Sequence, residues 1–354
     1  METRVRITAA LVDGNSIRAT SRMTSVDKNT VMDFGLRLGF GCNRIHNRVV
    51  RDIAAYLLSA DETWSFCSKK QARVTEADPA EWGDLYTFVA LDSTTKLVVS
   101  YLAGKRDQAT TDAFIEDLRA RLSVAPHFST DGWQPYISAV AEHFRGSIDY
   151  GMVVKQYGYA KSPDHKYEAA RDARFIQKVP ISGAPVKELM STSHVERLNL
   201  TLRHTVGRTR RHCLAFSRKL ENHRAAIALG IAAYNFVRVH ATLGTTPAVA
   251  SGLAERPWTI AELVAVAMEE PDLEAPTAKP LAPRPGAEVP ARQTTTGRVL
   301  RLVHGGSAAA PVPEVTAPDA PAILGGPAQL GLFDPRPEPT KGRRPMEQLS
   351  LFDD

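Results

Sequence analysis

The segment LYTFVALDSTTKLVVSYL, residues 85–102, decides the fold class. Its two halves, Leu85–Leu91 and Lys96–Leu102, are rich in β-branched and aromatic residues, and the polar run Asp92–Thr95 between them is typical of a hairpin turn. We therefore predict two antiparallel strands. Upstream, residues 63–67 (TWSFC) alternate between apolar and polar side chains and predict a strand that precedes the hairpin.

Downstream of the hairpin, helical and strand patterns alternate. Residues 108–122 place Phe114, Ile115, Leu118 and Leu122 on one stripe, which predicts an amphipathic helix. The order of elements predicts an α/β architecture with a mixed sheet flanked by helices. The remaining predictions are a strand near 125–130, a helix near 134–144, a strand near 150–154, an irregular insertion over 155–190 and a helical region over 193–240.

The first forty residues predict three short helices. Asp13–Asn15 interrupts the first helix, Ser16 can cap the second, and a tight turn at 24–26 precedes the third. This layout is that of a helix-turn-helix, although an ordinary three-helix packing unit would give the same pattern. In a helix-turn-helix, Lys28, Asn29 and Thr30 would lie at the end of the recognition helix that reaches DNA bases. A further packing helix is expected near 44–58.

The charge of the chain is unevenly distributed. The formal net charge is +5, from 44 basic and 39 acidic residues in a chain of 354. The first 270 residues carry an excess of +6, whereas residues 271–354 carry −1 and hold fifteen of the 23 prolines. A modest basic excess suggests nucleic acid as a partner without establishing it.

Several classes of protein are excluded by composition. No run approaches the roughly 20 apolar residues of a membrane-spanning helix, and the first residues do not resemble a secretory signal. The three cysteines, Cys42, Cys67 and Cys213, are far apart and indicate neither disulfides nor a zinc site. We expect a soluble protein of a reducing cytoplasm.

Three acidic residues stand out by their context. Asp61 opens the first predicted strand, Asp131 follows the fourth, and Glu196 lies on a helix. If the first and fourth strands are neighbours and the helix packs over them, the three carboxylates converge. Hard oxygen ligands suit two Mg²⁺ or Mn²⁺ ions, which can clamp the attacking and leaving oxygens of a phosphodiester.

A strongly basic segment follows Glu196. Residues 197–224 hold eight Lys and Arg and one acid, Glu221, for a net charge of +7. Such a segment can contact phosphates beside an acidic metal site, although a charged run is often only a solvated helix face. Arg203 lies two helical turns after Glu196, on the same face. The predicted phosphate-binding residues are Arg197, Arg203, Arg208, Arg210, Arg211 and Lys219.

Several short blocks, in order, resemble a known family. They are residues 61–66 (DETWSF), 130–133 (TDGW), 195–203 (VERLNLTLR), 216–223 (FSRKLENH) and 234–240 (YNFVRVH). Together with Thr246–Ala248 and the helix-turn-helix region, they resemble DDE transposases of short bacterial insertion sequences. The resemblance covers roughly residues 5–265. It implies an RNase H-like catalytic domain in which Asp61, Asp131 and Glu196 bind two Mg²⁺ or Mn²⁺ ions. It also implies a place in the bacterial cytoplasm, in association with the nucleoid.

Two points qualify the resemblance. Asp92 rivals Asp61 as the first carboxylate because it also follows a strand, but its Ser-Thr-Thr-Lys context favours a turn. Many relatives carry a cysteine-rich zinc element before the helix-turn-helix, and the corresponding cysteines are missing here. We therefore expect recognition of the element ends to be weaker or to use other segments.

Two similar peptides stand out in the proline-rich tail, whose composition is typical of a disordered linker. Residues 329–334 (QLGLFD) and 348–353 (QLSLFD) match at five of six positions. They resemble the peptide by which bacterial replication and repair proteins bind the sliding clamp, although a duplicated apolar tail without a partner is the alternative. The predicted contact residues are Gln329, Leu330, Leu332, Phe333, Gln348, Leu349, Leu351 and Phe352.

The sequence therefore predicts three domains. Residues 1–58 would form the helix-turn-helix, 59–268 the catalytic domain, and 269–354 the disordered tail. The predicted function is strand cleavage at element ends and strand transfer into target DNA by a homo-oligomer. The alternatives are a non-catalytic DNA-binding regulator derived from a transposase and an RNase H-like nuclease.

Overall fold

The computed structural model describes residues 1–157, 173–210, 214–269, 278–282, 292–293 and 299–300. The described parts of Met1–His304 belong to one compact unit. The elements are α1 (Glu2–Val12), α2 (Ile17–Thr24), α3 (Lys28–Val49), β1 (Leu57–Cys67), η1 (Gln71–Arg73), β2 (Gly83–Asp92), β3 (Val98–Gly104), α4 (Gln108–Arg121), β4 (His127–Thr130), α5 (Pro135–Phe144), β5 (Asp149–Tyr157), β6 (Ala173–Ser182), α6 (Ser193–Thr205), η2 (Gly207–Thr209), α7 (Leu220–Ala232), the π-helical η3 (Ala233–Val237), α8 (Pro247–Ala250), α9 (Ile260–Glu269), β7 (Arg292–Gln293) and β8 (Val299–Leu300).

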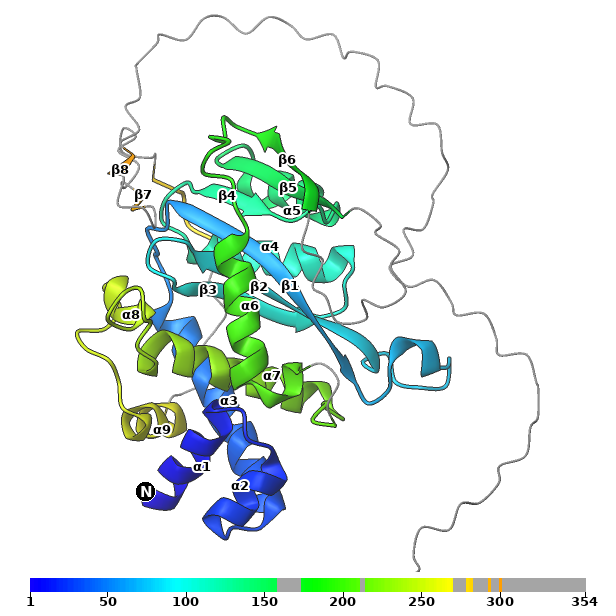
Figure 1. Cartoon of the computed structure of the whole chain (residues 1–354), viewed down its shortest axis with the longest axis vertical. Coiled ribbons are helices and arrows are strands. Elements are labelled where there is room, and N and C mark those ends of the chain that lie inside the picture. Colours follow the sequence, from blue (N-terminus) through cyan, green and yellow to red (C-terminus); the bar gives the residue numbers. More distant parts are fainter. Residues whose placement is uncertain (158–172, 211–213, 270–277, 283–291, 294–298, 301–354) are drawn as a thin grey trace, which may run out of the picture. The chain divides into compact units, whose positions relative to one another are not determined.

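The centre of the described structure is a mixed sheet with the strand order β3-β2-β1-β4-β5-β6 (Figure 1). β1, β2 and β3 form an antiparallel meander, and β4 and β5 run parallel to β1. α4 carries the chain from β3 across the sheet to β4, which therefore pairs with the first strand. The predicted α/β class is confirmed, and the order and directions of β1–β5 are those of RNase H-like sheets.

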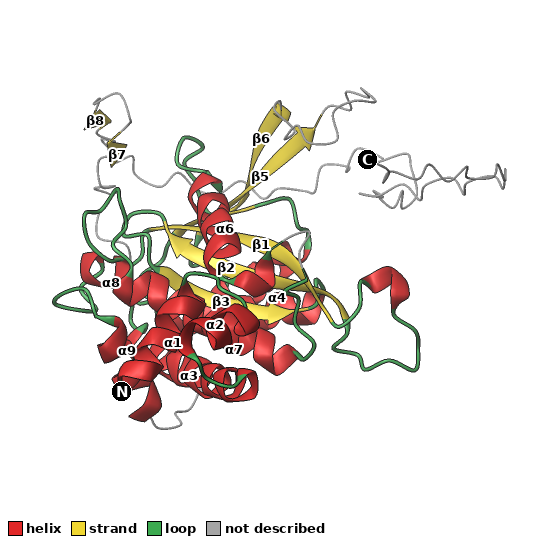
Figure 2. Ribbon diagram, turned by 60° about the horizontal axis from the view of Figure 1, so that its bottom comes forward, coloured by secondary structure: helices red, strands yellow, loops and turns green. Residues whose placement is uncertain are grey.

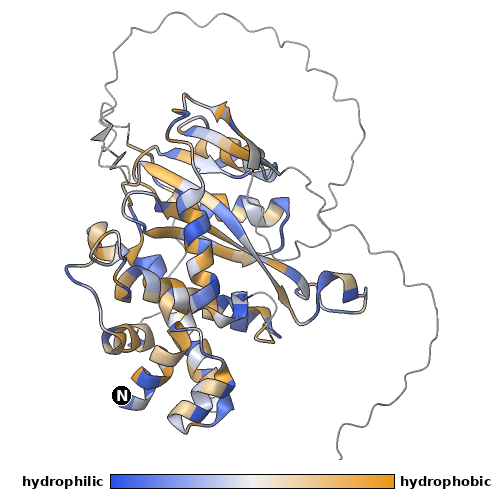
Figure 3. Ribbon diagram, viewed as in Figure 1, coloured by the Kyte–Doolittle hydropathy of each residue, from blue (hydrophilic) through white to orange (hydrophobic). Residues whose placement is uncertain are grey.

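Helices cover both faces of the sheet, and β2 shows how. Phe88 and Ala90 pack into a core with α4, α5 and the C-terminal half of α3. The alternating residues Val89 and Leu91 pack into a second core with α6 and α7. Figure 2 shows α6 crossing β1 and β2, and Figure 3 shows hydrophobic and hydrophilic residues following one another along that helix.

The three N-terminal helices begin close to the predicted positions. The Ser16 side chain accepts a hydrogen bond from the Ala19 N–H at the start of α2, and Asp27 caps α3 in the same way through the Asn29 N–H. α3 continues without a break to Val49, where a separate helix over 44–58 was expected. The apolar i+4 spacing in that region prolongs one helix, and Leu57 already belongs to β1.

α3 is embedded between α7 and α9. A Cβ atom on Gly39 would lie 2.2 Å from the Ala225 carbonyl oxygen of α7, and one on Gly41 would lie 1.9 Å from the Ala267 oxygen of α9. Both distances are far below van der Waals contact. The two glycines therefore permit backbone approaches that no other residue would allow.

Three further predictions are corrected by the structure. β1 starts at Leu57, so Asp61 lies within the strand and does not open it. Part of the predicted irregular insertion forms β6, an antiparallel partner of β5. The helical region 193–240 is divided into α6, η2, α7 and η3, so the basic segment is not one helix.

No helix in the described residues is both long and apolar enough to cross a membrane. Cys42 and Cys67 are buried free thiols, while Cys213 lies outside the described residues. The two clamp-like peptides also lie outside the described residues.

Candidate metal centre

The strand register brings Asp61 and Asp131 together. In the parallel pair of β1 and β4, Ser59 faces Ser129. Asp61 and Asp131 each follow two residues later, so they lie at the same level, where β4 has just ended. Carboxylate oxygens of Asp61, Glu62 and Asp131 all lie within 4.8 Å of one another.

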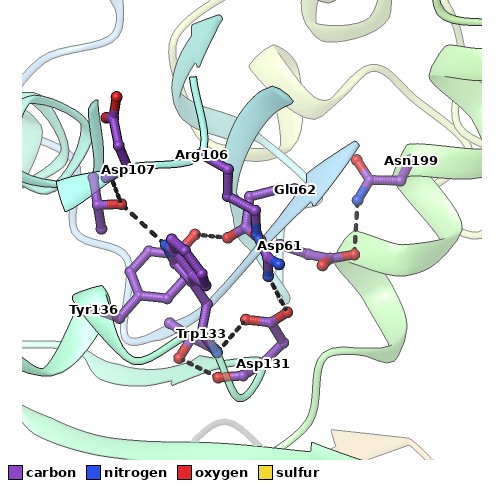
Figure 4. A network of polar contacts seen from close by, with 10 residues as sticks. Asp61, Glu62, Arg106, Asp107, Asp131, Trp133, Tyr136 and Asn199 are labelled. Carbon is purple, nitrogen blue, oxygen red and sulfur yellow. Dashed lines mark hydrogen bonds and ion pairs between the residues drawn. The ribbon is translucent and has the colours of Figure 1, made fainter. Parts of the chain in front are cut away.

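Glu62 was not among the residues predicted for this site. Asp61 pairs with Val89 of β2 and therefore faces α6, whereas Glu62 pairs with Phe88 and faces α4 and α5. Asn199 of α6 accordingly donates a hydrogen bond to Asp61 Oδ2 at 2.8 Å. Tyr136 of α5 donates one to Glu62 Oε1 on the other face. Asp131 has a carboxylate oxygen within 4.8 Å of both Asp61 and Glu62, and Figure 4 shows its side chain next to that of Asp61.

Arg106 connects Glu62 to Asp131. Its Nε and Nη2 donate to Glu62 Oε2 at 3.2 and 3.1 Å, and Nη2 also reaches Asp131 Oδ2 at 3.4 Å. The guanidinium carbon lies 4.1 Å from the centre of the Trp133 ring. The Trp133 backbone N–H in turn donates to Asp131 Oδ1 at 3.0 Å. Figure 4 shows this network.

Glu196 lies at the edge of the group, in the first turn of α6. Its Oε1 accepts hydrogen bonds from Lys155 Nζ of β5 and from Thr192 Oγ1, and its side chain is 40% exposed. It does not belong to the set within 4.8 Å, but its charge raises the pKa of Asp61 and of Asp131.

The carboxylates of the site carry unfavourable charge. Burial and the neighbouring Asp131 raise the pKa of Asp61 to about 6. The same two causes raise the pKa of Glu62 to about 8, and burial raises that of Asp131. Arg106 and Lys155 offset only part of this negative charge, so the site favours additional cations.

The donor set fits a hard divalent cation such as Mg²⁺ or Mn²⁺. All the side chains that converge offer oxygen atoms. In addition, Asn199 is 3% exposed, and its Oδ1 has no hydrogen-bond partner among the described residues. A buried amide oxygen beside Asp61 that lacks a donor is well suited to a cation or to the water bound to one.

Asp92, the rival of Asp61, serves the hairpin turn. Its carboxylate accepts hydrogen bonds from the N–H groups of Thr94 and Thr95 and from the Thr95 hydroxyl. It pairs with Leu58 in the register, three residues before Asp61. The sequence-based preference for a turn at this position is therefore confirmed.

The basic segment after Glu196 divides into inward and outward residues. Arg197 and Arg210 are exposed, and Lys219 is exposed with an ion pair to Glu221 at 3.5 Å. Arg203 is half-buried, and Arg211 lies outside the described residues. Arg208 faces inward, where its Nη1 donates to Ser217 Oγ at 3.3 Å.

Ser217 belongs to a buried cluster at the end of β1. His223 of α7 is fully buried, with Ser217 Oγ 3.0 Å from its Nδ1 and Ser65 Oγ 3.4 Å from its Nε2. The Ser68 N–H donates to the Ser217 carbonyl, and the ring of Phe216 stacks on that of Phe66. These contacts fasten the basic loop to the strand that carries Asp61.

Comparison with known proteins gives a limited result. No protein-family model matches the sequence, and no curated protein matches it. Among solved structures, a piggyBac transposase synaptic complex with hairpin DNA has a TM-score of 0.33 at 11% identity, over 74% of this chain and 59% of that one. A Mos1 transposase paired-end complex has a TM-score of 0.18 at 13% identity, over 39% and 56%.

A Mos1 strand transfer complex has a TM-score of 0.20 at 14% identity, over 64% of this chain and 78% of that one. The chain thus spans less than three fifths of the length of the first two of these structures. The neighbours are transposases bound to DNA, but similarity at this level is too low to assign an activity.

Proposed function

We propose that the chain is a DDE transposase of the kind found in bacterial insertion sequences, which cleaves DNA at element ends and joins the freed ends to target DNA. The observation that carries the proposal is the convergence of Asp61 in β1 and Asp131, directly after β4, beneath the helix that holds Glu196. A carboxylate cluster at this position of an RNase H-like sheet supports phosphodiester chemistry with Mg²⁺ or Mn²⁺.

Asp61, Asp131 and Glu196 would hold two divalent ions, which supply positive charge that activates water and stabilises the phosphorane-like transition state. In the first step, water attacks the phosphorus and the bond to the 3′-oxygen breaks, leaving a 3′-hydroxyl. In the second, this hydroxyl attacks a phosphorus of the target strand, whose own 3′-oxygen leaves with the proton. One P–O bond forms for each one broken, so no external energy source is needed.

DNA contacts would come from two surfaces. The exposed residues Lys28, Asn29 and Thr30, at the N-terminal end of α3, would read the element end as part of a helix-turn-helix. Arg197, Arg203, Arg210, Arg211 and Lys219 would bind phosphates near the carboxylates. Arg208 is a weaker candidate, since it donates to Ser217 within the protein.

Two partners complete the proposal. Cleavage and joining at two element ends require two copies of the site, so we expect a homo-oligomer on DNA. The peptides at 329–334 and 348–353 would bind the bacterial sliding clamp and direct insertion towards replicating or repaired DNA. A pull-down with purified clamp tests the second point, and binding that survives Leu351→Ala with Phe352→Ala contradicts it.

The experiment that tests the proposal is an oligonucleotide assay with the full chain, Mg²⁺ and duplexes taken from the DNA that borders the gene. We expect both cleaved and joined products. Asp61→Asn, Asp131→Asn and Glu196→Gln should each reduce product formation by about 10³-fold, because each removes charge that stabilises the transition state.

The matched control is Asp92→Asn, which changes an acid on the neighbouring strand that serves a turn. It should retain activity. Cleavage without joining would favour the RNase H-like nuclease, and DNA binding without either reaction would favour the regulator. Full activity in Asp61→Asn would contradict the proposed site.

A further inference from the structure

Arg106 is fixed beside the carboxylates by several contacts, and the function proposed above gives it no role. It lies between β3 and α4, directly before Asp107, whose side chain caps α4 by accepting a hydrogen bond from the Thr110 N–H at 2.8 Å. At Gly104, a Cβ atom would lie 2.6 Å from Thr110 Cγ2. The backbone on which Arg106 stands is therefore tightly packed.

The guanidinium is also held on several sides. Glu62 accepts from Nε and Nη2, and Trp133 packs against the guanidinium plane at 4.1 Å. Trp133 is itself fixed, since its Nε1 donates to Thr111 Oγ1 at 3.1 Å and its backbone N–H donates to Asp131. An arginine held in this way has lost its rotamer freedom before any ligand arrives.

Glu62 has the properties of an anchor for this arginine. Its side chain is 2% exposed, and both of its oxygens already accept hydrogen bonds, Oε1 from Tyr136 and Oε2 from Arg106. A metal ion at Glu62 would have to share oxygens that already accept three hydrogen bonds in a buried position. Asp131, by contrast, is 34% exposed and open to a ligand.

The guanidinium retains a free edge. The Arg106 side chain is 31% exposed. Among the described residues, its hydrogen bonds to Glu62 and Asp131 are made by Nε and Nη2, and Nη1 takes no part in them. A guanidinium with two remaining N–H donors matches the oxygens of a phosphodiester. The neighbouring nitrogen Nη2 reaches Asp131, where DNA would need a cation against the surrounding carboxylates.

We propose that Arg106 binds a non-bridging oxygen of the DNA phosphodiester at this site, and that Glu62 is a positioning residue for Arg106 and not a metal ligand. This inference rests on the function proposed above. Glu62, Tyr136 and Trp133 hold the guanidinium in advance, so that the phosphate meets a donor that does not need to be ordered during the reaction.

The test uses Arg106→Ala in the full chain, with Glu62→Gln combined in a second variant so that no buried carboxylate is left without its partner. Both variants should lower DNA cleavage by about a hundredfold. Added guanidinium ion should restore activity to Arg106→Ala, because Glu62, Tyr136 and Trp133 still form its cradle. It should not restore the double variant, in which the amide of Glu62→Gln presents an N–H donor where Glu62 offers an accepting oxygen.

A second measurement follows Mn²⁺ binding by calorimetry, without DNA or turnover. Asp131→Asn should weaken Mn²⁺ binding by about tenfold or more, and Glu62→Gln should weaken it clearly less. The matched control pair is Arg256→Ala with Glu262→Gln, an exposed Arg–Glu contact outside the site, which should cleave DNA normally.

The outcomes separate the two proposals. If the unaltered chain neither cuts nor joins DNA, the proposed function fails. If it does so and folded Arg106→Ala keeps its activity, or guanidinium restores both variants equally, the role of Arg106 fails. Equal losses of Mn²⁺ affinity in Glu62→Gln and Asp131→Asn would make Glu62 a ligand and overturn its positioning role.

Discussion

Strand β1 carries Asp61 and Glu62 near its middle and Ser65 near its end, and the two regions bury polar groups in different ways. Around Asp61, carboxylates lie within 4.8 Å of one another and raise the pKa of their neighbours. Around Ser65, both ring nitrogens of the neutral His223 are within hydrogen-bonding distance of serine hydroxyl groups. One region keeps electrostatic repulsion that a cation can relieve, and the other has almost none.

This difference distinguishes a candidate binding site, around Asp61, from a structural contact, around Ser65 and His223. A buried group that is satisfied within the protein contributes to stability and gains nothing from a ligand. Like charges held together reduce stability until a ligand arrives, which is a common property of functional sites. The predictions below measure the two regions against each other.

The largest effect should come from the structural contact around His223. His223→Ala would leave a cavity and remove the partner of Ser65 and Ser217, so we expect a loss of about 4 kcal/mol in the free energy of unfolding. Urea denaturation measures it. A loss below about 1 kcal/mol would show that the hydroxyl contacts do not hold the loop to β1.

The same histidine should make stability depend on pH. Burial and nearby Arg208 lower the pKa of His223 to about 4, whereas in the unfolded chain it is near 6.5. The unfolded state therefore binds more protons between these values, and stability falls as pH is lowered through that window, by about 3 kcal/mol. Urea denaturation at a series of pH values should show this slope, and His223→Asn should flatten it.

The predictions for His223 concern a loss of stability. The acidic region around Asp61 should instead gain stability when it binds a metal ion. Mg²⁺ or Mn²⁺ at a hundred times its dissociation constant should stabilise the chain by about 2.7 kcal/mol, because it binds the folded state alone. Thermal unfolding with and without the ion measures this gain. Asp61→Asn and Asp131→Asn should lose most of it, and Asp92→Asn should keep it.

The smallest effect should be a gain in stability without metal. Burial raises the pKa of Asp61 to about 6, so its charge opposes folding, and this penalty grows as pH rises from about 4 to 6. Asp61→Asn should therefore raise the free energy of unfolding at pH 7 by about 1 kcal/mol, with allowance for solvent screening. Denaturation in EDTA measures it, and destabilisation would mean that Asp61 has a structural role.

The sheet could be predicted from sequence because its strands carry strong local patterns. Leu85–Leu91 and the run after Asp92 read as strands by composition alone, and β4 was placed by its apolar residues before Asp131. β6 could not be found in this way, since its sequence ARFIQKVPIS contains a proline and charged residues. Its pairing with β5 is a long-range contact.

The candidate site was predictable only in part. Asp61 and Asp131 stood out by motif and position, but Glu62 and Arg106 are recognisable only through the register and the packing of α5. Adjacent strand residues face opposite sides, so nothing in the sequence grouped Glu62 with Asp61. The signal that was available was the rarity of two adjacent acids in an otherwise buried strand.

If the first residues of α3 bind DNA as proposed, the continuity of this helix would set a distance for recognition. A helix of 22 residues is about 33 Å long, close to the length of ten base pairs. Because Gly39 and Gly41 fix its second half against α7 and α9, its first residues cannot swing separately from the sheet. DNA held at Lys28–Thr30 would then meet the carboxylates at a constant offset. Such a protein would cleave DNA at a fixed distance from the sequence that it recognises.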